Sequence, residues 1–410
     1  LYLVSQKKVY KNIGYLLLVQ FANYIAPLLV LPYLTRVLGV EAFGTIVMAM
    51  SMCSIAMILT DFGFNLSGTF WVSKNRHDKI EIAKYVSAVT FAKIFLCFLS
   101  VFFVWLYDFY AENNFGIHIT TAISVVVISQ GFQLTWFFQG IEKMRNVTAS
   151  LVTAKLLYMF LVFAFVKDQN DAVVVLYCLA FSNIVSIFIG FILLYLEEIK
   201  ISIPRARNVK SAVKSSISFF LSRAAVGVYT SASTFIVGAF CNVHQAAIYS
   251  SAEKLYQAGQ GLVSPVSQAL FPYLATTRDG KSLYRFVSIL LIPMVLGCLI
   301  CGLYAEEIVT LIYGAEFLGA GQVLLIFMAT SVITFISINF GYPAYSIINK
   351  LSFVNYTVMV AGVFQLLSLS YLYFSHSISP ITIAWSVFLV EVAVMIMRVG
   401  FFIVCIRKQH

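Results

Sequence analysis

The sequence predicts an all-α integral membrane protein with twelve transmembrane helices in two sets of six. Its composition is the first observation, because 61% of the 410 residues are hydrophobic and only 11% are charged. A soluble chain of this length could not bury so much apolar surface in one core. Secondly, apolar runs long enough to cross about 30 Å of hydrocarbon recur from end to end. The third observation is that Lys and Arg residues concentrate in the loops on one side of the predicted spans.

Twelve apolar runs, separated by short polar breaks, are the predicted spans. They lie near 13–35, 42–62, 85–107, 117–138, 147–166, 173–196, 214–239, 245–273, 285–304, 320–343, 353–374 and 381–405. The polar linker after the sixth run predicts an N-terminal six-helix lobe over 1–203 and a C-terminal lobe over 204–410. We expect no cleavable signal peptide, because the first run leads directly into the next.

The basic residues predict the orientation. With the N-terminus in the cytoplasm, 20 of the 27 Lys and Arg residues fall on that side, and only Arg36 and Lys167 fall on the other. Since cytoplasmic loops carry the excess of Lys and Arg, both termini are predicted to be cytoplasmic. The same pattern explains the net charge of +10, so no nucleic-acid partner is expected. We expect the tryptophans to be interfacial anchors, since all fall near span ends: Trp71, Trp105, Trp136 and Trp385.

A weak repeat relates the two halves. The segment "VLGVEAFGTIVMAMS" (37–51) aligns with "FCNVHQAAIYSSAEK" (240–254), and "FQGIEKMRNVTA" (138–149) aligns with "YSIINKLSFVNY" (345–356). Six predicted helices separate the copies. The halves should therefore run in the same direction, related by an axis along the membrane normal.

The first alignment predicts a helix break at the same place in both halves. The second predicted helix is weakened by Gly63 and Gly68, and the eighth by Pro265 and Pro272. Breaks at matching positions point to a transport pathway, and the freed backbone groups need protein, water or ligand partners. Asp61 at the first break is predicted either to couple an ion or to cap the helix end.

Charged residues inside the spans indicate a site. They are the cations Lys93, Lys155, Arg223, Lys254 and Arg398, and the anions Asp61, Glu253 and Glu391. Each costs about 2.5–3.5 kcal/mol at a helix centre, so we expect these groups to line a water-filled cavity or to pair across helices. The excess of positive charge suits an anionic substrate such as a pyrophosphate. For Lys93 and Arg398, extension to the cytoplasmic interface is an open alternative. Glu391 and Arg398 lie seven residues apart on one helix face, so they either neutralise each other or bind a neighbouring helix.

Catalytic chemistry is not indicated. The five histidines are scattered, and we find no zinc-protease motif or paired carboxylates. We therefore predict no catalytic residue, no metal site and no cofactor.

The chain resembles the Wzx-type O-antigen flippases, polysaccharide transporters of the multidrug/oligosaccharidyl-lipid/polysaccharide superfamily. The resemblance lies in "LPYLTRVLGVEAFG" (31–44), "TDFGFNLSGT" (60–69), "WFFQGIEKMR" (136–145) and "YSSAEKLYQ" (249–257). It implies a MATE-like fold, in which two six-helix lobes surround a central cavity that opens alternately to either face. It also implies ion-coupled transfer of undecaprenyl-pyrophosphate-linked repeat units from the cytoplasmic to the periplasmic leaflet of the bacterial inner membrane.

This resemblance implies the partners. They are the lipid-linked oligosaccharide, membrane lipid, a coupling H⁺ or Na⁺, and other polysaccharide-assembly proteins. We expect the intramembrane cations to bind the substrate, and Asp61, Glu253 and Glu391 are the candidates for ion coupling. A multidrug antiporter of the same fold is the alternative, although such proteins usually expel cations. A membrane polysaccharide polymerase fits less well, because the predicted periplasmic loops are short.

Overall fold

The computed structural model describes residues 2–111 and 115–407, with side chains described except in parts of α1, α8 and α9. These residues form α-helices and two short 3-10 helices, with no strand among them. In order they are α1 (Tyr2–Asp61), α2 (Phe64–Lys74), α3 (Lys79–Tyr110), α4 (Ile117–Gly131), α5 (Thr135–Gly140), α6 (Met144–Phe165), η1 (Gln169–Asp171), α7 (Ala172–Leu196), α8 (Ala206–Phe240), α9 (Val243–Thr277), α10 (Gly280–Leu303), α11 (Ala305–Tyr313), η2 (Ala315–Phe317), α12 (Ala320–Asn339), α13 (Tyr342–Ile347), α14 (Leu351–Phe374) and α15 (Pro380–Arg407).

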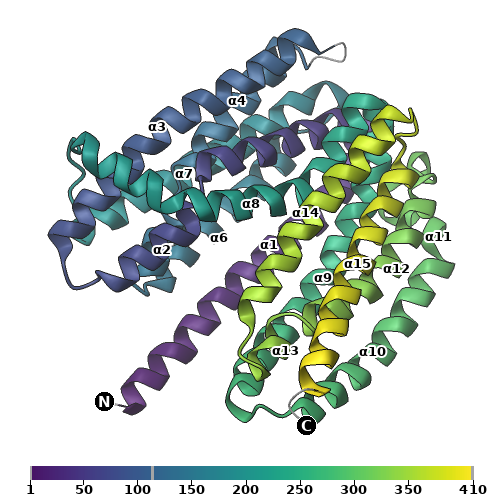
Figure 1. Cartoon of the computed structure of the whole chain (residues 1–410). Helices are drawn as coiled ribbons and strands as arrows, with labels where there is room; N and C mark the ends of the chain where they lie inside the picture. Colours follow the sequence, from purple (N-terminus) through teal and green to yellow (C-terminus); the bar gives the residue numbers. More distant parts are fainter. Residues whose placement is uncertain (1, 112–114, 408–410) are drawn as a thin grey trace. The chain divides into compact units, whose positions relative to one another are not determined.

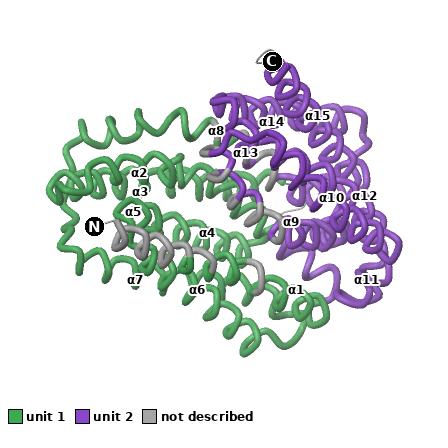
Figure 2. Tube along the Cα trace, turned by 90° about the horizontal axis from the view of Figure 1, so that it is seen from below, with its two compact units in different colours: residues 1–38, 49–224 green, residues 39–48, 225–410 purple. Residues whose placement is uncertain are grey.

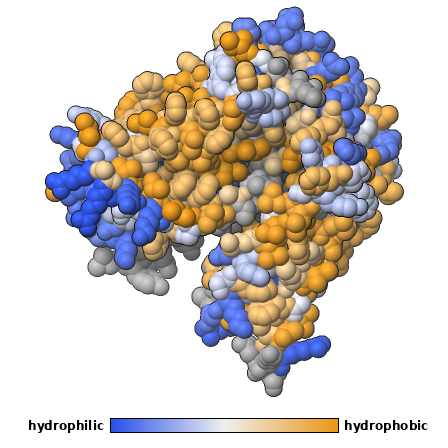
Figure 3. Space-filling view, turned by 45° about the horizontal axis from the view of Figure 1, so that its top comes forward, coloured by the Kyte–Doolittle hydropathy of each residue, from blue (hydrophilic) through white to orange (hydrophobic). Residues whose placement is uncertain are grey.

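Membrane-length apolar helices dominate the chain. Within the described residues, nine stretches are long and apolar enough to cross a membrane by length and composition. One of them, Leu18–Lys74, contains most of the first predicted span and all of the second. The two are merged because α1 continues through a kink at Gly39, whose φ of 71° and ψ of 175° are not helical. The face drawn in Figure 3 is largely apolar, with hydrophilic side chains gathered toward its margins. This distribution is typical of helices that contact lipid.

The chain divides into two compact units (Figure 2). Unit 1 comprises residues 1–38 and 49–224, and unit 2 comprises 39–48 and 225–410. The division therefore falls within α8 rather than in the polar linker before it. In addition, a short piece of α1 belongs to unit 2.

The core of unit 1 forms where α2 packs against α5. Glycines permit this approach: a Cβ on Gly68 would lie 2.7 Å from Trp136 Cε3, and one on Gly140 would lie 2.7 Å from Val72 Cβ. The indole of Trp136 fills the space beside Gly68 and is only 1% exposed. Its prediction as an interfacial anchor was therefore wrong, because a glycine on the neighbouring helix makes room for it inside the protein.

In unit 2, α12 is the central helix and contacts α9, α10 and α15, which lie around it in Figure 1. Aromatic rings just after α12 and on α13, α14 and α15 pack against one another. Phe340 packs edge-on against Phe402, with ring centroids 5.7 Å apart, and Tyr345 stacks on Phe353 at 5.3 Å. Aromatic pairs of this kind each contribute about 0.5–1.5 kcal/mol beyond the area that they bury.

Candidate functional site: a polar cavity in unit 1

The helix break between α1 and α2 occurs at Phe62 and Gly63, which have φ angles of 46° and 76°. Glycine adopts such angles without steric cost. A Cβ at Gly63 would lie 2.7 Å from the backbone nitrogen of Phe220, so α8 passes directly against the break. The rings of Phe62 and Phe220 stack there, with centroids 4.5 Å apart. The break therefore fixes the part of α8 that carries Arg223.

Asp61 closes the end of α1 at this break. Its Oδ1 accepts a hydrogen bond from the backbone N–H of Asn65, 3.2 Å away, in the first turn of α2. Such a bond satisfies one of the free N–H groups at a helix N-terminus. The carboxylate also interacts electrostatically with Lys93 and Arg223. Asp61 thus caps α2, as one of the two predicted roles requires, and lies close to two of the predicted cations.

The other predicted break positions do not interrupt a helix. Gly68 lies in the middle of α2, where it serves close packing. The helix α9 is continuous from Val243 to Thr277 and passes through Pro265 and Pro272, whose side chains lie outside the described residues. The expected interruption of the eighth helix was therefore wrong for this structure. A proline removes one hydrogen bond and can bend a helix without ending it.

A cavity of about 460 Å³ lies beside the break and is lined by α1, α2, α4, α5, α6, α7 and α8. Its lining is rich in amide side chains, and it includes two of the predicted cations, Lys155 and Arg223. The amides are Asn23, Asn65, Gln130, Gln133, Gln139 and Asn183. Hydroxyl groups of Thr135, Tyr158 and Ser182 complete the polar surface. No carboxylate is found among the described residues of this lining.

One donor in the cavity is unused. Gln133 Nε2 donates to Asn183 Oδ1 at 3.2 Å, whereas Asn183 Nδ2 has no hydrogen-bond partner among the described residues. Asn183 is only 6% exposed. Because a buried donor left unpaired costs about 1–3 kcal/mol, this amide is available for a ligand.

The lining can bind two kinds of chemical group. Amides both donate and accept hydrogen bonds, as recognition of sugar hydroxyls requires. Guanidinium and ammonium groups bind phosphate oxygens, the former through a planar fork and the latter as a point charge. Lys155 and Arg223, which are far apart in the sequence, are therefore the groups suited to bind an anion in an otherwise neutral polar cavity.

Lys93 is not among the residues that line this cavity. It is 5% exposed, and its Nζ donates to the carbonyl oxygen of Gly131, 2.8 Å away at the C-terminal end of α4. A cation at this position satisfies a free carbonyl and interacts favourably with the helix dipole. The ammonium of Lys93 therefore connects α3 to α4 and does not extend to an interface.

The remaining predicted residues lie in unit 2. Glu253 is buried in α9, and its Oε2 accepts a hydrogen bond of 2.9 Å from Thr234 Oγ1 on α8. Its neighbour Lys254 is half-buried and donates to Gln257 Oε1 at 3.1 Å. Glu253 thus has a partner on another helix, whereas Lys254 is bonded within its own.

Arg398 connects three helices of unit 2. From α15, its Nε donates to Thr357 Oγ1 on α14 at 3.0 Å, and its Nη1 donates to the carbonyl oxygen of Ser337 on α12 at 2.9 Å. The residue is 8% exposed, so it does not extend to the interface. Glu391, also buried in α15, interacts with it electrostatically. No ion pair within 4.0 Å joins the two among the described residues, so their mutual neutralisation stays a prediction, whereas Arg398 does bind neighbouring helices.

Sequence reasoning missed the amides, because it considered only formal charges. A signal was present in "SQGFQLTWFFQG" (129–140), where three glutamines occur in and just after an apolar run. Polar residues in a span are expensive and usually face a bundle interior or a cavity. All three, Gln130, Gln133 and Gln139, line this cavity.

Membrane-length helices and a polar cavity within unit 1 define a multi-pass membrane protein of helical-bundle architecture. Solved membrane transporters share its overall fold. The solved lipid II flippase MurJ, in an inward closed conformation, aligns with a TM-score of 0.71 and 14% identity over 95% of this chain and 87% of that chain. An inward-facing multidrug resistance MATE family transporter aligns with a TM-score of 0.63 and 11% identity over 94% of this chain and all of that one. At these identities the likeness shows the fold alone.

The particular family follows from the sequence match. Residues 9–278 match the family described as polysaccharide biosynthesis protein, and the chain belongs to it. The "Putative O-antigen transporter" of Shigella dysenteriae is 32% identical over 269 residues, which cover 65% of this chain and 67% of that protein. The chain is therefore a multi-pass transporter of the polysaccharide family, not an enzyme.

Proposed function

We propose that this protein is a flippase that moves a lipid-linked oligosaccharide across the membrane. The observation that carries the proposal is the amide-lined cavity of unit 1, with Lys155 and Arg223 in its wall. Amides match sugar hydroxyls, and the two cations match a pyrophosphate. Relatives described as O-antigen transporters and a glycan biosynthesis flippase support the same substrate class.

The details of transport form part of the proposal. The cargo would be an undecaprenyl-pyrophosphate-linked repeat unit, transferred from the cytoplasmic to the periplasmic leaflet of a bacterial inner membrane. The proposal counts twelve spans by dividing α1 at Gly39, including α8 and α9, and taking α4 with α5 and α12 with α13 as one span each. The placement of Lys and Arg supports cytoplasmic termini, and the repeat supports six-helix lobes over 1–203 and 204–410.

Alternating access would be coupled to H⁺ or Na⁺ through Asp61, Glu253 or Glu391. Asp61 lies in unit 1, and the two glutamates lie in unit 2. All three are held by a hydrogen bond or an electrostatic partner, so a change of ionisation would alter helix contacts. Other polysaccharide-assembly proteins would supply the substrate and remove the product.

Reconstituted transport of a labelled undecaprenyl-pyrophosphate oligosaccharide tests the proposal. The double variant Lys155→Gln, Arg223→Gln removes two charge-assisted contacts, and we expect its rate to fall at least about tenfold. The double variant Lys200→Gln, Lys210→Gln removes the same charge from exposed positions outside the cavity and should transport normally. Normal transport by the first variant would exclude the cavity as the substrate site. The same conclusion would follow from normal transport by a triple variant in which Lys254, the predicted cation in unit 2, is also neutralised.

A multidrug antiporter of the same fold is the second candidate, since MATE transporters share the architecture. The cationic lining argues against it, because cationic drugs would be repelled. Efflux of a cationic dye by the reconstituted protein, without oligosaccharide transport, would reverse the order of the two.

A further inference from the structure

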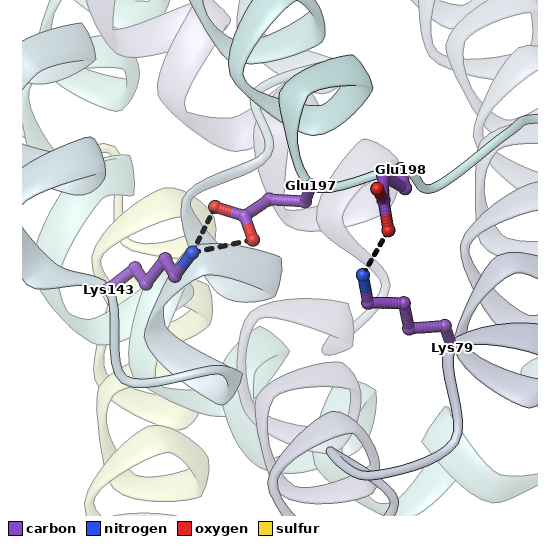
Figure 4. A network of polar contacts seen from close by, with 4 residues as sticks. All are labelled: Lys79, Lys143, Glu197 and Glu198. Carbon is purple, nitrogen blue, oxygen red and sulfur yellow. Dashed lines mark hydrogen bonds and ion pairs between the residues drawn. The ribbon is translucent and has the colours of Figure 1, made fainter.

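Two carboxylates of the linker between α7 and α8 each have a cation of their own (Figure 4). Glu197 accepts hydrogen bonds of 2.5 and 2.6 Å from Lys143 Nζ, and Glu198 pairs with Lys79. Both lysines are exposed, so water and salt screen these charges. Asp61 is placed differently, because it is half-buried and no cation lies within 4.0 Å of its carboxylate among the described residues.

The break between α1 and α2 brings Asp61 to the part of α8 that carries Arg223. The ring of the next residue, Phe62, stacks on Phe220 with centroids 4.5 Å apart and an interplanar angle of 11°. Arg223 follows Phe220 by three residues, so the two occupy neighbouring positions on one face of α8. The carboxylate of Asp61 interacts electrostatically with Lys93 and with Arg223. One half-buried anion is therefore shared between two cations.

Arg223 keeps its hydrogen-bond donors for the cavity. It is exposed, it lines the amide-lined cavity, and it makes no hydrogen bond or ion pair within the part of the chain that the structure describes. Lys93 differs, since its Nζ is bonded to the carbonyl oxygen of Gly131. Asp61 therefore acts on Arg223 through its charge alone, and an anion can approach the guanidinium without displacing a direct partner.

A carboxylate beside a phosphate-binding arginine weakens the binding of the phosphate. Two negative charges repel each other, and in a partly buried place this repulsion is screened less than at the surface. Asp61 does not line the cavity, but its Oδ1 accepts a hydrogen bond of 3.2 Å from the backbone N–H of Asn65, which does line it. The charge of Asp61 therefore lies directly behind the cavity wall, near Arg223 and not on the cavity surface.

We infer that Asp61 is the counter-ion of Arg223 in the empty cavity and limits how tightly the cavity holds the phosphate of its cargo. The inference rests on the proposed function, because it takes the pyrophosphate of a lipid-linked oligosaccharide as the ligand. In the empty cavity the carboxylate offsets positive charge, which is costly inside a membrane. In the loaded cavity it repels the phosphate. Binding must be strong enough for the cargo to enter and weak enough for it to leave.

Asp61→Asn tests this role, because asparagine caps a helix as well as aspartate does but carries no charge. The full-length protein is reconstituted, and the initial rate is measured against the concentration of a labelled undecaprenyl-pyrophosphate oligosaccharide. We expect KM to fall about three- to tenfold and kcat to fall by a similar factor, since tighter binding slows release. In an Arg223→Gln background the same change should lower KM less than about twofold, because the phosphate is no longer held beside Asp61.

Asp78→Asn is the matched control. Asp78 caps α3 by accepting hydrogen bonds of 3.0 Å from the backbone N–H groups of Ile80 and Glu81, and it is exposed and does not line the cavity. The control loses the same charge and keeps the same kind of cap, so its KM and kcat should equal those of wild type. Asp61→Ser is a second neutral cap, which keeps the test available if Asp61→Asn impairs folding.

A fall in KM that is specific to Asp61 and depends on Arg223 supports the inference. An unchanged or raised KM would overturn it and leave Asp61 as a capping or ion-coupling residue. An equal fall in KM in the Asp78→Asn control, or an equal fall in the absence of Arg223, would also overturn it. In each of these cases wild type still transports the oligosaccharide, so the proposed function stands. Absence of transport by wild type would overturn both.

Discussion

Replacing Gly63 with alanine should separate α8 from the break between α1 and α2. The residue has a φ of 76°, and its new Cβ would lie 2.7 Å from Phe220 N and 2.8 Å from Phe219 Cβ. A left-handed conformation costs a non-glycine residue about 1–2 kcal/mol, and overpacking adds about 1–3 kcal/mol, so the free energy of unfolding should fall by about 2–5 kcal/mol. Arg223 lies one turn beyond the contact, so transport should fall as well.

Gly116→Ala is the matched control. Gly116 has the same φ of 76°, but a Cβ there would have nothing within 4 Å. Its ψ of 159° places it in a region reserved for glycine, so this variant carries at least the backbone cost without the collision. Thermal unfolding of the purified variants and transport in vesicles are the measurements. If Gly63→Ala is no less stable than Gly116→Ala, the contact with α8 does not limit this position.

Two further predictions concern charged side chains. Arg398→Gln breaks a buried network and leaves Glu391 without its cation, so the free energy of unfolding should fall by about 3–5 kcal/mol. The double variant Arg398→Gln, Glu391→Gln should recover part of this loss in the same thermal unfolding assay. An unchanged unfolding midpoint for Arg398→Gln would refute the structural role of Arg398. Lys79→Gln removes the ammonium whose hydrogen bond and charge lower the pKa of Glu198 below its ordinary 4.5. A lowered pKa stabilises the fold only while the carboxylate is ionised. The small difference in melting temperature between Lys79→Gln and wild type should therefore be full above pH 4.5 and shrink at lower pH. A difference that does not change with pH would contradict this prediction.

The membrane-spanning character was predictable from the sequence, because apolar length is a local property of the chain. The break at Gly63 was predictable for the same reason, since glycine supplies the left-handed angle wherever the chain needs it. Pro265 and Pro272 show the limit of this reasoning. A proline weakens a helix locally, but whether the helix ends there depends on what packs around it.

The site was predictable only in part. Lys155 and Arg223 were expected in a cavity, and they share one. Lys93 and Arg398 were also expected in a cavity, because a charged side chain inside a span is costly. Instead, a carbonyl or hydroxyl group on another helix accepts a hydrogen bond from each of them. Such partners are 38 to 61 residues away in sequence, and no local pattern identifies them. The repeat alignment did carry tertiary information, because it pairs Gly44 with Ala247, and these two residues are in contact.

The amide lining of the cavity has a consequence for the divergence of relatives. Asparagine and glutamine differ by one methylene, and either can exchange its donor and acceptor by turning its terminal group. A substitution between them, or to serine or threonine, rearranges the hydrogen-bonding pattern without adding a charge to the membrane interior. Under the proposed function, selection for a new surface glycan could therefore change these side chains singly, while Lys155 and Arg223 would keep the contact proposed for the pyrophosphate.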